Sequence, residues 1–146
     1  MQAYRYRKVD WAPGAALAAP LAKAKVALIS TAGLHTPQQP PFDNAQRGGD
    51  CSFREIPNAV DVKTLRIAHR SSAFDQTGAL EDRNLVFPLD RLREMQARGE
   101  IGELNHRHLS WMGSISAPGR LMRETAPQAA AMLRQDDVKA ALLAPA

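Results

Sequence analysis

The chain has 146 residues, and its 19 Lys and Arg against 15 Asp and Glu give a formal net charge of +4. That length allows one compact domain. No stretch approaches the roughly 20 uninterrupted apolar residues that span a bilayer, which excludes a membrane-spanning protein. Aromatic residues are 5% of the chain and the arginines are scattered, so we do not expect nucleic-acid binding. The single cysteine, Cys51, excludes an internal disulfide and favours a cytoplasmic location.

The beginning of the chain is expected to be a cover segment rather than a secretion signal. An Ala-rich stretch follows a few basic residues, but Asp10, Pro13 and Gly14 interrupt it. We therefore divide the chain into an N-terminal cover segment, residues 1–24, and an α/β domain, residues 25–146.

The first half of that domain is predicted to hold three strands. The apolar run 25–31 is typical of a strand buried on both faces. A loop without regular structure is expected over residues 32–50, which are rich in proline and glycine, and loops of that length are often functional. Residues 52–56 alternate weakly between polar and apolar and residues 64–69 alternate better, so the second run is the firmer strand prediction.

The second half is predicted to hold two helices and two strands. One helix begins at Pro88 and stops at Gly99. Another is expected over 118–135, with a kink or a break into two helices at Pro127, where Thr125 to Gln128 also matches a capping box. Residues 109–112 read as a strand, and residues 138–143 as a short buried one.

This alternation predicts an α/β fold with three layers, a mostly parallel sheet with flanking helices. A buried parallel strand is normally followed by a loop and a covering helix. The last strand, 138–143, has neither behind it. We therefore expect the chain to be truncated after a central or near-edge strand.

Two histidines are candidates for catalysis because of where they stand. His35 comes shortly after the first predicted strand and His69 closes another. In open parallel sheets the ligand crevice lies outside the carboxyl ends of the strands. The structural alternative for each is a capping or surface histidine, because a base must be shown to reach its proton.

Other polar residues are candidates to organise the substrate or the loops. They are Asp50, Arg54, Asp82, Asn84 and His106. His106 and His108 would face the same side of an extended backbone and could share a metal with a third ligand. Half-exposed imidazoles are common at that kind of position, so no metal site is expected, and a His-based metal-dependent enzyme is kept as an alternative.

A set of segments carries a family resemblance that runs from about Lys25 to the last residue. The segments are Val26–His35, Gly49–Pro57, Ala68–His69, Phe74–Asp75, Asp82–Arg93, Gly99–Gly102, Asn105–His106, Met112–Gly113 and Glu124–Pro127. Together they resemble the selenoprotein B subunits of the glycine, sarcosine, betaine and D-proline reductases, and most of all the selenocysteine-containing subunit of proline reductase. The sequence departs from that pattern at Cys51, where the family has a hydroxyl or another small residue.

The resemblance implies reductive C–N cleavage of D-proline or a related amine with a dithiol donor. It implies that a pyruvoyl group on a partner subunit holds D-proline as an imine and that a selenocysteine attacks its α-carbon. His35 and His69 would donate the proton that the leaving amine needs, while Asp50 and Arg54 organise the loop. The protein is therefore expected to work as part of an oligomer.

The family's redox motif, a selenocysteine followed three residues later by cysteine, is expected directly after Ala146. Because the selenocysteine codon UGA is also a stop codon, we expect that the chain was read or expressed only to that residue. This chain then holds no nucleophile of its own and is expected to be redox-inactive alone. The remaining alternative is a non-catalytic interaction domain that docks a partner through its last strand.

Overall fold

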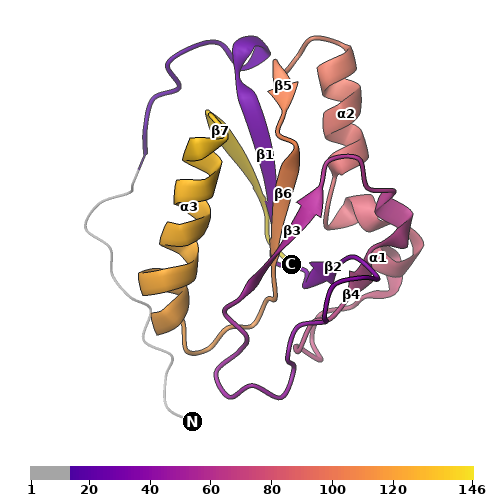
Figure 1. Ribbon diagram of the computed structural model, residues 1–146. Helices are drawn as coiled ribbons and strands as arrows, with labels where there is room; N and C mark the ends of the chain where they lie inside the picture. The colour runs from indigo at the N-terminus through magenta and orange to yellow at the C-terminus, as the bar shows by residue number, and fades with distance from the viewer. Residues whose placement is uncertain (1–13) are drawn as a thin grey trace.

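A computed structural model describes residues 14–146 of the protein (Figure 1). Residues 1–13, which are most of the expected cover segment, lie outside the described residues. The strands are β1 (Lys25–Ser30), β2 (Leu34–His35), β3 (Phe53–Pro57), β4 (Arg66–Ile67), β5 (Glu103–Leu104), β6 (Arg107–Trp111) and β7 (Ala140–Ala144). The α-helices are α1 (Thr77–Glu81), α2 (Leu89–Ala97) and α3 (Ala126–Gln135), and a π-helical turn, Leu121–Thr125, leads into α3. Short 3₁₀ turns cover Leu21–Lys23, Val62–Thr64 and Arg83–Leu85.

The main sheet is built around β1, and its order confirms a mostly parallel α/β fold. β7 pairs in parallel with one edge of β1, while β5 and then β6 pair in parallel with the other edge. β3 is antiparallel to β6 and makes the sheet mixed. A separate antiparallel pair, β2 with β4, lies beside the main sheet (Figure 1).

Helices cover the two faces of the sheet and give the three predicted layers (Figure 1). On one face, Leu89 and Leu92 of α2 belong to the larger core cluster, together with Val26 and Leu28 of β1. On the other face, Ala129 and Leu133 of α3 pack with Ala27, Leu109 and Trp111. β1 therefore contributes to both cores, as its continuous apolar sequence predicts. In the described part of the chain no helix is long and apolar enough to cross a membrane.

Several local predictions differ from the structure. The weakly alternating run 52–56 forms the five-residue strand β3, because every residue of β3 pairs with β6. The better alternating run 64–69 forms only the two-residue strand β4. The loop 32–50 contains the short strand β2. The helix does not divide in two at Pro127: the π-helical turn Leu121–Thr125 runs directly into α3, and Pro127 lies in the first turn of α3. Thr125 does not act as a cap, because its hydroxyl donates to the Cys51 carbonyl at 2.7 Å. The last strand is largely exposed rather than buried.

A buried imidazole completes the hydrogen bonding of β1. Between β5 and β6, the four residues 105–108 stand opposite only Ala27 and Leu28, so the ladder is interrupted there. The Leu28 N–H donates instead to Nδ1 of His108 at 3.0 Å. Nε2 of the same ring contacts Asn58 Oδ1 at 3.2 Å, and because Nδ1 accepts, Nε2 must be the donor. His108 thus replaces a missing strand partner in the middle of the sheet.

His108 is predicted to make the stability of the fold depend on pH. Burial above all, with the charges of Arg93 and His106, lowers the pKa of His108 to about 4. In the unfolded chain the ring titrates near 6.5, so the unfolded state gains the proton first and stability falls from about pH 6.5 down to about pH 4. The share of His108 in that loss is roughly 3 kcal/mol.

The measurement is the free energy of unfolding from denaturant titrations at pH 7, 6, 5 and 4. His108→Leu is expected to be about 1–3 kcal/mol less stable at pH 7, because the Leu28 N–H loses its acceptor, and to show a flatter dependence on pH. The control is His106→Leu, because His106 is exposed. Equal pH slopes in the wild type and in His108→Leu would contradict the assignment.

Candidate functional site

The carboxyl ends of β1, β6 and β7 meet at one edge of the sheet, near the point marked C in Figure 1. Thr31 follows β1, Gly113 comes shortly after β6, and Ala146 comes shortly after β7. The Ala146 N–H donates to Oγ1 of Thr31 at 2.9 Å, which fixes the end of β7 against the end of β1. In open sheets with parallel strands this edge is where ligands bind.

The small β2–β4 sheet brings His69 to that edge. The Gly33 N–H donates to the Trp111 carbonyl at 2.8 Å, and the Ala68 N–H donates to the Gly33 carbonyl at 2.9 Å. Gly33 has φ +70°, and a Cβ there would lie 2.1 Å from the Ala68 carbonyl oxygen, so only glycine allows this approach. His69 follows directly after this anchored segment.

His69 presents an unpartnered nitrogen to the end of β6. The residue is 8% exposed, and the centre of its ring lies 4.6 Å from the centre of the Phe74 ring. Its Nδ1 accepts a hydrogen bond from the Ser71 N–H at 3.1 Å. Nε2 is buried and has no hydrogen-bond partner in the described residues. A Cβ on Gly113 would lie 2.1 Å from Nε2 and 3.0 Å from the Thr31 carbonyl oxygen, so Nε2 lies against the backbone at this edge.

The protonation of His69 follows from these contacts. Burial lowers the pKa of His69, which favours the neutral ring at pH 7. Since Nδ1 accepts a hydrogen bond, the proton of the neutral ring is on Nε2. A buried N–H donor without an acceptor is rare in folded proteins.

His35 has the opposite arrangement. It is 5% exposed, and its Nδ1 lies 2.9 Å from the Thr36 carbonyl, to which it can only donate. In the neutral ring Nε2 is therefore a free acceptor. His35 of β2 pairs with Arg66 of β4, and His69 comes three residues after Arg66 in the chain, beyond the end of β4. No hydrogen bond joins the two histidines in the described part of the chain.

Asp50 and Arg54 hold the long loop 36–50 together. Asp50 accepts hydrogen bonds from the Asp43 N–H at 3.0 Å and from the backbone and hydroxyl of Ser52 at 2.8 and 2.6 Å. Burial alone would raise the pKa of the Asp50 carboxyl, but these hydrogen bonds and the Arg54 charge outweigh it and lower the pKa. Asp50 therefore stays ionised within the loop.

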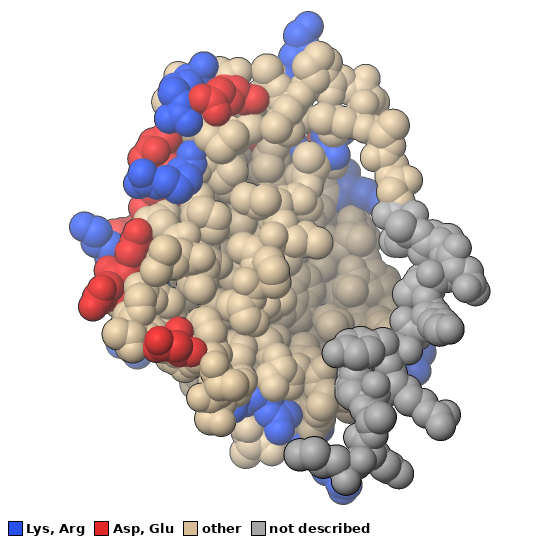
Figure 2. All heavy atoms as spheres, turned by 180° about the vertical axis from the view of Figure 1, so that it is seen from behind, with Lys and Arg blue, Asp and Glu red and all other residues tan. Residues whose placement is uncertain are grey.

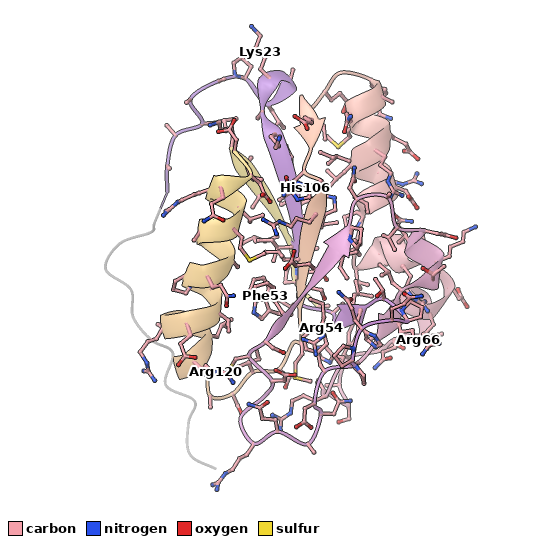
Figure 3. The ribbon with its side chains drawn as sticks, viewed as in Figure 1. Lys23, Phe53, Arg54, Arg66, His106 and Arg120 are labelled. Carbon is pink, nitrogen blue, oxygen red and sulfur yellow. The ribbon has the colours of Figure 1, made fainter. Side chains whose placement is uncertain are left out.

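The Arg54 guanidinium contacts the same loop from β3. It donates to the carbonyl oxygens of Pro40 at 2.9 Å and Pro41 at 3.1 Å, and it lies 4.2 Å from the centre of the Phe42 ring. Its Nη2 is 4.0 Å from the Asp50 carboxylate. Figure 3 shows Arg54 near this loop and His106 well away from it, toward the other end of the sheet.

The remaining candidate residues lie elsewhere. Asp82 accepts from the Asn84 N–H at 2.9 Å, and the Asn84 amide donates to Asp90 at 3.0 Å, so this pair shapes the chain before α2. His106 is exposed between β5 and β6. His108 uses both ring nitrogens, and the described residues contain no group of three or more His, Cys, Asp or Glu side chains placed to hold a metal. The metal-dependent alternative therefore has no support in this part of the chain.

Sequence reasoning did not single out two residues of the edge, Thr31 and Gly113, as parts of a site. A glycine close behind a strand is a signal for a close approach of another group, and Gly113 is such a glycine. That the approaching group is an imidazole depends on tertiary structure, because His69 is 44 residues away along the chain.

The fold and this edge define an α/β protein with polar groups gathered at the carboxyl ends of its parallel strands. Residues 2–146 match the family described as glycine/sarcosine/betaine reductase selenoprotein B. The chain belongs to this family.

Curated relatives come from several reductases. D-proline reductase subunit gamma of Acetoanaerobium sticklandii is 32% identical over 118 residues, which cover 81% of this chain and 47% of the relative. Glycine reductase complex component B subunit gamma of Carboxydothermus hydrogenoformans is 30% identical over 64% of this chain and 22% of its own length. Sarcosine reductase complex component B subunit beta of Peptoclostridium acidaminophilum is 28% identical over 68% of this chain and 23% of its own length. This chain therefore matches less than half of each relative, and no solved structure matches it.

The contact between His69 and Gly113 is testable by substitution. Gly113→Ala is expected to lower the free energy of unfolding by about 1–3 kcal/mol, because the new methyl group would overlap the imidazole. In His69→Ala the same substitution should cost much less, because the ring is gone. Gly14→Ala is the control, since nothing lies within 4 Å of a Cβ there. Additive effects of His69→Ala and Gly113→Ala would show that the two residues do not touch.

Proposed function

We propose that this chain supplies the scaffold and the proton-handling residues of a reductase subunit that cleaves the C–N bond of D-proline or a related small amine. In this reaction the C–N bond breaks, the carbon gains a hydrogen and the nitrogen gains a proton. The two electrons come from a dithiol, which becomes a disulfide. Membership of the family and the likeness to D-proline reductase subunit gamma support the proposal.

The observation that carries this proposal is the free Nε2–H of His69 at the carboxyl edge of the sheet. It is buried, it has no acceptor among the described residues, and it lies beside Thr31 and Gly113. Such a donor suits an anionic or electron-rich partner, because a charge-assisted hydrogen bond to a desolvated N–H is strong.

We place the family's selenocysteine, with a cysteine three residues later, directly after Ala146. The hydrogen bond from Ala146 to Thr31 supports this placement, because it holds that end of the chain at the edge where His69 lies. A selenolate there would supply the nucleophile, and a pyruvoyl group on a partner subunit would supply the electrophilic carbon that holds the amine. The described residues suit this chemistry because His69 offers an N–H donor at this edge.

The two histidines take different roles in this proposal. His69 is neutral and donates a hydrogen bond from Nε2. His35 is the proton donor for the leaving amine: its Nδ1–H bond to the Thr36 carbonyl persists when Nε2 is protonated, so the ring can gain and lose that proton without losing its anchor. Asp50 and Arg54 keep the loop after His35 in place.

The proposed subunit works in an assembly with a pyruvoyl-bearing partner. The relatives support this, because two of them are named as components of complexes and all three as subunits. A dithiol-dependent reaction also fits the reducing cytoplasm, where we place the protein.

The role of His35 is tested in the full-length subunit assembled with its partner. His35→Asn is expected to lower kcat for D-proline about 100-fold or more, the usual effect of losing a general acid. His106→Asn is the matched control, because that ring is exposed and remote from the edge. Unchanged kinetics in His35→Asn would reject the role.

The placement of the selenocysteine is tested on the coding sequence. We expect an in-frame UGA codon directly after the codon for Ala146 and a cysteine codon three positions later. A different terminator, or no cysteine codon shortly downstream, would exclude this part of the proposal while leaving the family membership intact.

A further inference from the structure

The outer edge of β7 is unprotected. The Thr31 N–H donates to the Ala144 carbonyl, so alternate residues of β7 bond to β1 while the backbone groups of Ala141 and Leu143 point away from it. No other described strand pairs with that edge. The strand, Ala-Ala-Leu-Leu-Ala, has none of the charges or prolines that normally protect an edge.

β3, the outer strand on the opposite side of the sheet, is covered by other parts of the chain. The Gln39 side-chain amide donates to the Glu55 carbonyl of β3 at 2.8 Å, and Arg54 ties the same strand to the loop at Pro40 and Pro41. Pro57 ends β3 and cannot donate to a further strand. The two edges therefore differ: β3 is protected, and β7 is open for pairing.

Apolar grooves lie on both sides of β7. The groove on the α3 face has a volume of about 520 Å³, and Leu143 in its wall is 66% exposed. The groove on the α2 face has a volume of about 310 Å³, and Leu142 in its wall is 42% exposed. Seen from behind, the middle of the molecule is a broad uncharged area, with the charged residues gathered toward its rim (Figure 2). A strand with a groove on each face is what an inner strand of a larger three-layer sheet looks like when its neighbours are missing.

We propose that β7 pairs with a strand from the part of the reductase subunit that this chain does not match in its relatives, and that apolar segments of the same part fill both grooves. The match covers 47% of D-proline reductase subunit gamma, so a full subunit contains enough further sequence for a strand and its covering helices. A second copy of this chain is a poorer occupant. A second copy would present its own unpaired β7 with the same two grooves, so pairing of the two β7 strands would leave the grooves of both copies unfilled.

This inference rests on the family membership and not on the proposed activity. Its test is hydrogen exchange of backbone amides, with native mass, on the 146-residue chain and on the full-length D-proline reductase subunit gamma. In the 146-residue chain we expect a monomer in which the amides of Ala141 and Leu143 exchange quickly. In the full-length subunit the amides of the strand that aligns with β7 should exchange on the order of 100-fold more slowly, because both edges are then hydrogen-bonded.

Matched substitutions separate the possible occupants. Leu143→Lys is compared with Leu85→Lys, because the two leucines are 66% and 68% exposed. Both variants should leave the 146-residue chain folded and monomeric, whereas in the full-length subunit only the substitution that aligns with Leu143 should lower the melting temperature. A dimer of the 146-residue chain that Leu143→Lys dissociates, or fast exchange of the β7 amides in the full-length subunit, would overturn the proposal.

Discussion

The fold depends on one constraint: the backbone N–H and C=O groups along both edges of the buried strand β1 need hydrogen-bond partners. A backbone donor or acceptor left unpaired in the core costs about as much as a lost hydrogen bond. β7 satisfies one edge over five residues, and the other edge is shared between β5 and β6. Where these two do not meet, the His108 imidazole accepts from Leu28. That side chain supplies the acceptor for the one stretch of β1 that neither β5 nor β6 pairs with.

Much of this architecture could be predicted from sequence patterns. The continuous apolar run of β1, the proline before α2 and Pro127 next to the start of α3 are local signals, and the structure places elements at all three. That β3 is longer than β4 could not be predicted, because it depends on the register of β3 against β6, whose paired residues are 50 to 58 positions away in the chain. The exposure of β7 likewise depends on which strand pairs with its other edge.

The candidate site was predictable in part. The positions of His35 and His69 near predicted strand ends are properties of the sequence, but the tautomers are not, because they depend on the Thr36 carbonyl and the Ser71 N–H. His106 and His108 show the opposite case: their spacing suggests a shared role, yet one is exposed and the other completes the sheet. Spacing in sequence identifies which side chains share a face, and the tertiary contacts decide what each nitrogen does.

The close approach of His69 to Gly113 also limits how this family can change. The imidazole occupies the volume that any side chain at position 113 would need. A side chain at position 113 is therefore disfavoured as long as His69 is present, whereas a smaller residue at position 69 makes room for it. Across homologous subunits the residues at positions 69 and 113 are therefore expected to vary as a pair.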